Sequence, residues 1–395
     1  MLPCQTTKVH SCKIYIVHFS VITNLLKLTK IEICKVLTLL QPIMELARIA
    51  DCVIVSALAE LGAPTPTCTV ATHAGSFHCD EALATAMLRL VPTYADAPIV
   101  RTRDAAAIAA CTIAVDVGGT YDNATLRFDH HQRTFDAFFP GRSVTKLSSA
   151  GLIYKHYGRE VIATLSSAAG AAALSAATLE LVYQKVYDDF IEGVDAIDNG
   201  VSRHDDDAKY KVKTDLGARV GRLNPSWNEA NDNGVRNANF KKAMTIALEE
   251  LVACVNNIVM SWLPARAIVE AGVVASLPSE GKRGRAPPQI LKLPQSCPWQ
   301  SHLFEIEAEK GMVGAYKYCL YQDGSGKWRV QAVPERLGSF ASRKALPEQW
   351  RGIRDDALSE LSGIPGCIFV HASGFIGGNA TEVGAESMAE TALTM

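Results

Sequence analysis

The chain has 395 residues, of which 48% are hydrophobic and 20% are charged, and its formal net charge is −2. These proportions are typical of a globular protein, and a chain of this length is expected to form two domains. The small net charge argues against a protein that coats nucleic acid by bulk electrostatics, so contact with nucleic acid would need a local basic site. Eleven cysteines without CxxC pairs indicate reduced thiols in an intracellular protein.

The N-terminal segment differs in composition from the rest of the chain, and we predict that residues 1–67 form an extension outside the folded domain. Between Met1 and Met44 there are five lysines, one glutamate and no aspartate or arginine. The lysines interrupt every apolar run, so no stretch of roughly 20 apolar residues is available to cross a bilayer. An acidic-poor, amphipathic segment partly fits an organelle-targeting signal, although such signals favour arginine and serine. Targeting and a plain extension remain alternatives.

Short apolar runs and helical patterns alternate from Cys68 onwards. We predict strands at 68–72, 97–103, 112–119 and 126–131, and helices at 80–91, 104–110 and 148–158. Asp80 is placed like the N-cap of the first of these helices. Strands that alternate with helices predict an α/β fold with a mostly parallel sheet flanked by helices. Ligands of such sheets bind beyond the carboxyl ends of the strands.

The second half of the chain begins with helical sequence and ends with a smaller α+β pattern. We predict a long helix over 176–200, a polar loop over 202–237, a helix over 237–275 and a linker over 280–289. The Asp-Gly-Ser-Gly sequence at 323–326 predicts a hairpin. The C-terminal end is expected to run through a strand, a Gly-rich turn and a helix. The expected domains are therefore a catalytic domain at 68–277 and a C-terminal domain at 278–395.

Histidines and carboxylates gather where the predicted strands and the long helix end. These side chains are His73, His78, Asp80 with Glu81 beside it, Asp116, Asp129, His130, His131, Asp195 and Asp198. Mixed histidine and carboxylate sets without cysteine suit Mn²⁺, Fe²⁺ or Zn²⁺, and carboxylate-rich sets favour Mn²⁺ and Mg²⁺. This set is larger than one ion needs. We therefore expect two divalent ions, Mn²⁺ first, with Mg²⁺ or Zn²⁺ as alternatives.

Each of these residues also has an ordinary structural interpretation. His73 alone could be a hydrogen-bonded surface histidine, and Asp116 before two glycines could serve a turn. Asp195 and Asp198, three residues apart, could lie on a solvated helix face. Cys79 lacks the histidine and asparagine partners of a cysteine nucleophile. Only the combination of these residues at the strand ends of one domain favours a metal site.

The adjacent histidines of the Asp129-His130-His131 run follow a predicted strand. Neighbouring side chains of a strand point to opposite faces, so the two histidines are not expected to do the same work. One of them would hold a ligand and the other would reach over it.

The order of these residues resembles the four motifs of the DHH phosphoesterases, a superfamily that includes RecJ-type exonucleases and manganese-dependent inorganic pyrophosphatases. The matching order is His73-x-x-x-x-His78-x-Asp80, then Asp116, then Asp129-His130-His131, then Asp198-Asn199-Gly200. More narrowly, THAGSFHCDEALA, FDHHQR, KLSSAGLIY, VDAIDNG, RLNPSW and GIPGCIFVHASGFIGG resemble the melanocyte proliferating gene (Myg) family of 3′–5′ RNA exonucleases. The resemblance runs from about Cys68 to the C-terminus and leaves the first sixty-odd residues without a counterpart.

The resemblance implies roles for individual residues. One ion would be held by His73, His78 and Asp116, the other by Asp80, His130 and Asp198, with Asp116 bridging and taking part in catalysis. His131 would face the scissile phosphate. The superfamily commonly has an aspartate in place of His78, which puts the metal preference of the first site in doubt. Asp195 competes with Asp198 for the fourth motif, and the Asn-Gly that follows Asp198 favours the latter.

The resemblance also implies a substrate, a substrate-binding domain and a location. The substrate would be the 3′ end of single-stranded RNA, bound without a membrane, and the protein would act in the mitochondrion or nucleus, with the cytoplasm as an alternative. The C-terminal domain would resemble the DHH-associated domain. Its expected substrate-binding residues are His371, Ser373, Gly374, Gly377, Gly378, Arg336 and Arg343.

Two other functions stay open at the level of sequence. A phosphatase or pyrophosphatase of the DHH type would act on small phosphorylated molecules or short oligonucleotides, and the lack of excess positive charge favours it. A metal-bound interaction protein without catalysis would not need the full set of candidate ligands.

Overall fold

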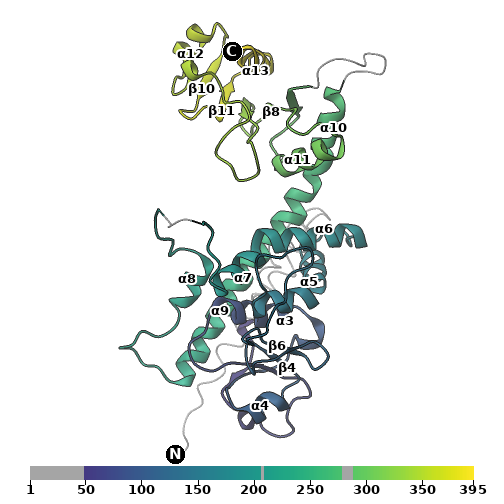
Figure 1. Ribbon diagram of the computed structural model, residues 1–395, viewed down its shortest axis with the longest axis vertical. Coiled ribbons are helices and arrows are strands. Elements are labelled where there is room, and N and C mark those ends of the chain that lie inside the picture. The colour runs from purple at the N-terminus through teal and green to yellow at the C-terminus, as the bar shows by residue number, and fades with distance from the viewer. Residues whose placement is uncertain (1–48, 206–208, 278–287) are drawn as a thin grey trace, which may run out of the picture. The chain divides into compact units, whose positions relative to one another are not determined.

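The computed structural model describes residues 49–205, 209–277 and 288–395 (Figure 1). The chain divides into two compact units, Met1–Ile258 and Val259–Met395. This division comes earlier than the predicted boundary after residue 277, because helix α10 (Leu263–Ser276) packs against strand β7 (Ile290–Leu293) of the second unit. Residues 1–48 of the predicted N-terminal extension and most of the predicted linker lie outside the described residues.

A six-stranded sheet organises the first unit. Its strands are β1 (Ile54–Val55), β2 (Val70–Thr72), β3 (Ile99–Arg101), β4 (Ile113–Val115), β5 (Tyr121–Asp122) and β6 (Arg127–Phe128). Their order is β1-β3-β2-β4-β6-β5, and every pair is parallel except β5 with β6. The predicted α/β class is confirmed, with a mixed sheet. Strands β2, β4 and β6, which precede the candidate ligands, are direct neighbours.

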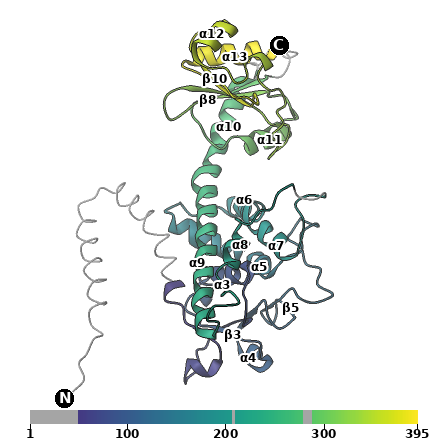
Figure 2. The ribbon, with the colours of Figure 1, turned by 90° about the vertical axis from the view of Figure 1, so that its left-hand side faces the viewer.

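Helices cover this sheet. They are α3 (Cys79–Leu88), α4 (Ala105–Ala110), α5 (Ser149–Ala168), α6 (Ala176–Val186), α7 (Glu192–Asp198), α8 (Leu216–Gly221) and α9 (Asn233–Asn257), with short 3₁₀ turns η1 (Leu58–Leu61) and η2 (Pro92–Tyr94). All ten residues of α3 are buried, and this helix packs against α5 and α9 (Figure 2). A helix that is apolar on every side requires such enclosure. The first turn of α3 therefore has a fixed position.

The sequence placed the start of the folded domain too late. Strand β1 pairs with β3, and Ile49, Cys52 and Val55 are buried, although all lie within the predicted extension. Lys241 donates a hydrogen bond to the carbonyl oxygen of Ala50. A strand of two residues has too little pattern to be recognised from sequence, and only its partner strand defines it.

The predicted helix over 176–200 is confirmed as a continuous helical run from α6 to α7, with a π-helical turn, η3 (Tyr187–Ile191), within it. Two other local predictions in the first unit were wrong. The N-cap of α3 is His78, and Asp80 lies in the first turn of the helix. The predicted polar loop contains helix α8, which begins after Asp215 because the Asp215 carboxylate accepts a hydrogen bond from the Ala218 N–H.

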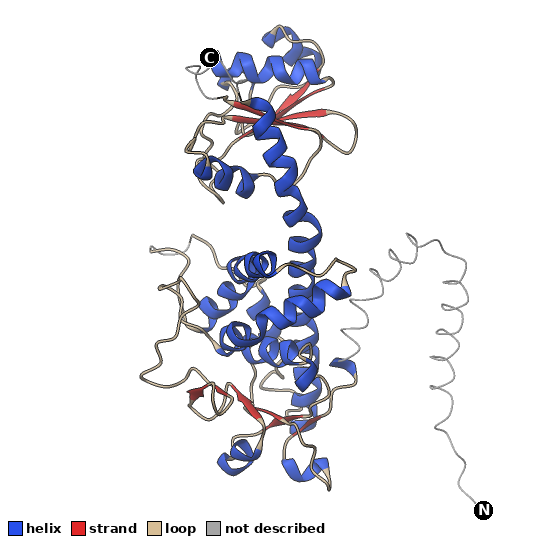
Figure 3. Cartoon of the chain, turned by 90° about the vertical axis from the view of Figure 1, so that its right-hand side faces the viewer, coloured by secondary structure: helices blue, strands red, loops and turns tan. Residues whose placement is uncertain are grey.

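The second unit is a five-stranded sheet with helices on both faces (Figure 3). Strand order is β10 (Cys367–Val370), β11 (Ile376–Asn379), β9 (Trp328–Ala332), β8 (Tyr318–Gln322) and β7, with only β7 and β8 parallel. One face packs on α10 and α11 (Gln300–Glu309), the other on α12 (Asp355–Ser362), α13 (Glu382–Thr394) and the 3₁₀ turn η5 (Glu348–Trp350). The predicted hairpin between β8 and β9 is confirmed.

The Gly-rich turn near the C-terminus is shorter than predicted. Gly374 lies in the turn between β10 and β11, with a φ of 74° that favours glycine. Gly377 and Gly378 instead lie within β11, paired on one side with β9 and on the other with β10. A Cβ on Gly377 would meet Leu346 and the Phe369 carbonyl oxygen at 3.0 Å. These two glycines thus allow close strand packing.

The helical run Asn233–Ser276 includes α9, the π-helical turn η4 (Ile258–Trp262) and α10. By length and composition alone it could cross a membrane, with a mean hydropathy of 1.5 in its most apolar 18 residues. Helices in the core of globular proteins share these properties. Phe240 and Leu251 are buried within the first unit, and Val269 packs in the core of the second.

Candidate metal centre

The strand ends bring together eight side chains that we call the His–carboxylate cluster. Its members are His73, His78, Asp80, Glu81, Asp116, His130, His131 and Asp198. Strands β2, β4 and β6 supply His73, Asp116 and the two adjacent histidines, because the carboxyl ends of parallel strands meet at one edge of the sheet. The first turn of α3 and the last residue of α7 complete the cluster.

Asp116 lies at the centre of the cluster. Its Oδ2 is 3.3 Å from His73 Nε2, and its Oδ1 is 3.5 Å from His130 Nε2. The residue has a φ of 58°, which is uncommon outside glycine and typical of functional sites. The Asp116 N–H donates to the Phe128 carbonyl oxygen, and Ser149 Oγ donates to Asp116 Oδ1 at 3.0 Å. The carboxylate is thereby held between two histidines.

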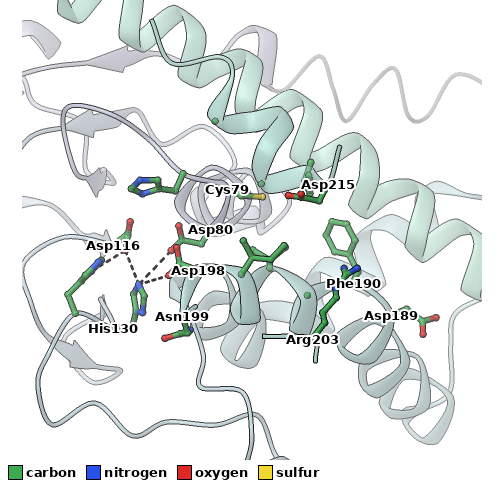
Figure 4. A pocket seen from close by; sticks show the side chains of 18 of the residues that line it. Cys79, Asp80, Asp116, His130, Asp189, Phe190, Asp198, Asn199, Arg203 and Asp215 are labelled. Carbon is green, nitrogen blue, oxygen red and sulfur yellow. Dashed lines mark ion pairs between the residues drawn. The ribbon is translucent and has the colours of Figure 1, made fainter. Parts of the chain in front are cut away.

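His130 and His131 follow strand β6 instead of lying in it, and their ring centroids are 4.3 Å apart. Both rings approach Asp116 Oδ1 at 3.5 Å, so the two side chains do not point to opposite faces, but their surroundings differ. His130 Nε2 points to Asp198 Oδ2 at 3.1 Å and to Asp80 Oδ2 at 3.9 Å (Figure 4). His131 is exposed, and its Nδ1 lies 2.8 Å from Asp129 Oδ1. The other oxygen of Asp129 accepts the Gly119 N–H. Asp129 therefore orients His131 and is not itself a member of the cluster.

Buried carboxylate oxygens without partners are the most informative feature of the cluster. Asp80 is 1% exposed, and neither of its carboxylate oxygens has a hydrogen-bond partner among the described residues. The same holds for Glu81 Oε2. Buried polar groups are nearly always satisfied, and a buried charge needs an opposite charge or a metal. A donor set of this kind fits divalent cations.

The pKa values of the cluster show how its charges interact in the absence of a cation. Burial, with the carboxylates of Asp116, Glu81 and Asp198, raises the pKa of Asp80 well above its usual range. Burial lowers the pKa of His73, but hydrogen bonds to Asp116 and Glu81 outweigh it and raise this pKa to about 10. A proton on His73 thus compensates neighbouring carboxylates, a role that a bound cation would take over.

Comparison with known proteins now identifies the chain. The family model MYG1_exonuc, described as an uncharacterised protein family (UPF0160), matches residues 69–393. MYG1 exonuclease of Mus musculus is 47% identical over 331 residues, covering 82% of this chain and 84% of its own length. The Homo sapiens MYG1 exonuclease is 46% identical (82% and 85%), and the MYG1 protein of Dictyostelium discoideum is 46% identical (81% and 95%). The chain belongs to the MYG1 family.

In this MYG1 family member, Asp195 and Asp198 have different surroundings despite their spacing. Asp195 is fully buried and accepts hydrogen bonds from the Ser148 N–H and Oγ, the Gly151 N–H and the Tyr187 hydroxyl. It therefore caps the N-terminus of α5, and a Cβ on Gly151 would overlap its carboxylate. Burial raises the pKa of Asp195 to about 7, against the effect of these hydrogen bonds. Only Asp198 reaches the cluster.

The expected substrate-binding residues all belong to the second unit. Arg343 forms a bidentate, buried ion pair with Glu307, with both N–O distances at 2.7 Å, and also donates to the Tyr316 carbonyl oxygen. This guanidinium is occupied and does not fit the expected role of a phosphate-binding cation. Arg336 is exposed in a loop. His371 and Ser373 are exposed beside Gly374 and hydrogen-bond to each other at 2.9 Å.

Two contributors to the site, Ser149 and Asn224, were not predicted from the sequence, and Glu81 was noted only as the neighbour of Asp80. Glu81 Oε1 is 2.8 Å from His73 Nε2 and also accepts the His78 N–H, so it is both a candidate ligand and part of a capping box. Ser149 holds Asp116. Asn224 exchanges two hydrogen bonds with the backbone of Phe77 and so fixes the loop that carries His78. Only Glu81 had a signal in the sequence, because a glutamate three residues after an N-cap is typical of a capping box.

A pocket of about 790 Å³ opens beside the cluster, a volume within the range of small-molecule sites. Cluster residues His78, Asp80, Asp116, His130, His131 and Asp198 line it. Asp80, Asp116, His130 and Asp198 lie at one end (Figure 4). Phe190 and Arg203 lie at the other end.

Proposed function

We propose that this chain is a divalent-cation-dependent phosphodiesterase that removes nucleotides from the 3′ end of single-stranded RNA. The observation that carries the proposal is the buried Asp80 carboxylate, which has no hydrogen-bond partner in the described part of the chain and is surrounded by three further carboxylates and by histidines. Membership of a family whose mammalian relatives are named exonucleases supports cleavage at a chain end. The neighbouring strand ends of β2, β4 and β6 are consistent with a DHH-type arrangement of the first unit.

The cluster offers two sets of ligands. His73, His78 and Glu81 form one group of neighbouring donors, and Asp80, His130 and Asp198 form another. Asp116 faces histidines of both groups, as a bridging carboxylate would. We assign two ions to these groups, Mn²⁺ before Mg²⁺ or Zn²⁺, because the donors combine imidazole with carboxylate. Such a pair of ions supplies Lewis acidity at phosphorus and lowers the pKa of the attacking water.

His131 is the residue of the chain placed to act on the substrate itself. Its imidazole is exposed, lines the pocket and is oriented by the Asp129 carboxylate at Nδ1. The Nε2 atom is then the one directed away from Asp129, where it can donate a proton to a phosphate oxygen. The 2.8 Å contact with Asp129 fixes the orientation of the ring. His131 would therefore control turnover, and His130 would control metal content.

The experiment is product analysis on RNA labelled at one end or the other. Protein stripped of metal should be inactive and should regain activity with Mn²⁺ much better than with Ca²⁺. RNA labelled at the 3′ end should release labelled mononucleotide at once, whereas RNA labelled at the 5′ end should shorten in steps. DNA of the same sequence, pyrophosphate and dinucleotides are assayed in parallel. Faster hydrolysis of pyrophosphate than of RNA would contradict the proposal and favour a small-molecule phosphatase.

Two variants separate the proposed roles within the site. His130→Ala should lose bound Mn²⁺, measured by elemental analysis, together with activity. His131→Ala should keep Mn²⁺ and lose turnover. Asp136→Asn is the matched control, because this exposed carboxylate pairs with Lys146 outside the cluster. Equal loss of Mn²⁺ in the two histidine variants would contradict the assignment.

A further inference from the structure

A glycine within a helix has no structural explanation in the fold. Gly193 is the second residue of α7, inside a helical run that continues from α6 through η3. Its φ is not in the left-handed region, and a Cβ built on it would meet nothing within 4 Å. Glycine in a helix interior is destabilising relative to alanine. Neither backbone conformation nor packing requires it, yet it lines the pocket beside the cluster.

The pocket wall around Gly193 is apolar and contains an aromatic ring. Phe190, Val194 and Ile197 come from the same helical run, and Leu216 comes from α8. Ile197 is 50% exposed, so part of this apolar wall is open to a ligand. A flat apolar group of a ligand would cover these side chains.

The π-helical turn η3 explains why Phe190 is available to the pocket. Such turns insert an extra residue in a helix and occur frequently at functional sites. Here the Glu192 N–H bonds to the Tyr187 carbonyl oxygen. Tyr187 is buried, stacks on Phe139 at 3.6 Å and donates to Asp195. Phe190, three residues later, is left only partly buried at the pocket.

We infer that this apolar half of the pocket is a subsite for the nucleobase of the nucleotide whose phosphate lies at the cluster. The inference rests on the proposed function. A phosphate at one end of the pocket directs the attached nucleoside along it, and the open space above Gly193 admits a flat ring next to Phe190. Arg203 lines the same pocket and offers its guanidinium to the base edge. Asn199 offers only its side-chain oxygen, because its amide N–H groups donate to the Lys146 and Asp195 carbonyl oxygens. The subsite would recognise a nucleoside phosphate and not a sugar phosphate alone.

The test is binding, which does not depend on turnover. Titration calorimetry with Mn²⁺ compares adenosine 5′-monophosphate with ribose 5-phosphate, which lacks the base. Stacking of a base on an aromatic side chain predicts that the wild-type protein binds the nucleotide roughly tenfold more tightly. Phe190→Ala should bring this ratio close to one. Trp227→Ala is the control, because Trp227 is 95% exposed and does not line the pocket.

Substitution of Gly193 separates the subsite from stability. Gly193→Ala and Gly193→Leu should both raise the Tm, by roughly 2–4 °C, because they remove a helix glycine without a steric clash. Only Gly193→Leu should fill the subsite and abolish the preference for the nucleotide, while binding of ribose 5-phosphate stays unchanged. A lowered Tm in both variants would show that the glycine is structural and would overturn the inference.

The outcome distinguishes this inference from the proposed function. If RNA is cleaved but the wild-type protein binds adenosine 5′-monophosphate and ribose 5-phosphate equally, the inference of a nucleobase subsite is wrong and the proposed exonuclease function is retained. If the nucleotide is preferred and Phe190→Ala removes the preference, but RNA is not cleaved, the nucleobase subsite is supported and the proposed exonuclease function is wrong.

Discussion

Two buried carboxylates, Glu307 in the second unit and Asp80 in the first, have opposite surroundings. Glu307 is 1% exposed, and its two oxygens accept four hydrogen bonds, from Arg343 and from the Gly314 and Tyr316 N–H groups. Asp80 is equally buried, yet its oxygens have no hydrogen-bond partner among the described residues. A buried charge with its partners in place is tolerated in a fold, whereas an unsatisfied one in a native protein indicates a missing ligand.

The largest expected effect is a loss of stability when the buried Arg343–Glu307 ion pair is broken. Arg343→Ala leaves the Glu307 carboxylate buried without a cation and should lower the free energy of unfolding by roughly 3–5 kcal/mol. Urea unfolding of the full chain, wild type and variant, measures this difference in the free energy of unfolding. Replacement of both partners, Arg343→Met with Glu307→Gln, removes both charges and keeps a side-chain carbonyl oxygen for the Gly314 and Tyr316 N–H groups, so it should cost less than the single substitution. If the single variant is as stable as the wild-type protein, the pair is not structural and the contrast between the units fails.

Removal of the Asp80 charge should leave stability intact and should abolish most of the activity, the reverse of what is expected for Arg343. Asp80→Asn removes a charge that has no partner, so the stripped protein should be at least as stable as wild type, while activity with Mn²⁺ falls at least about 100-fold, or about 2.7 kcal/mol. Thermal unfolding without metal and turnover with Mn²⁺ provide the two readings. A stripped variant that is clearly less stable than wild type would mean that Asp80 has a structural partner after all.

The same variant predicts a direction for the pH dependence of stability. The pKa of Asp80 is raised in the folded protein above its unfolded value, so the folded state binds the proton more tightly. This contribution is fully present below the unfolded pKa and is lost as pH rises through the folded pKa. Without metal, the advantage of Asp80→Asn over wild type should therefore grow as pH increases from about 4. Denaturation at several pH values tests this, and a constant difference would contradict it.

A smaller effect is expected from Ser149→Ala, which removes the hydrogen bond to Asp116 Oδ1. Groups that orient a metal ligand typically contribute about 10–100-fold to metal affinity, and we expect about tenfold here. Mn²⁺ titration measures it, with Ser149→Thr as the conservative variant that retains the hydroxyl. Equal Mn²⁺ affinity in Ser149→Ala and wild type would show that Asp116 is positioned by its backbone alone.

The sequence predicted the central metal-ligand candidates better than the residues and elements that position them. His73, Asp116 and His130 follow apolar strands, and strand ends meet at one edge of a parallel sheet, so their proximity follows from local pattern. The inward direction of Asp195 could not be predicted, because the π-helical turn before it changes the helical register. Gly377 and Gly378 looked like turn residues, since a glycine that permits close strand packing has the same local signature. Likewise, β1 is too short to show alternation.

The smallest expected effect concerns His371, whose role in substrate binding stays a prediction. Its exposed imidazole bonds only to Ser373 in the turn between β10 and β11, so His371→Ala should change stability by less than about 0.5 kcal/mol. If the turn contacts RNA, the loss of one hydrogen bond should raise KM by roughly threefold, with kcat and bound Mn²⁺ unchanged. Gly377→Ala is the informative contrast, because its Cβ would press on Leu346 and should lower stability instead. An unchanged KM in His371→Ala would remove this turn from the substrate path and leave the second unit without an assigned contact to RNA.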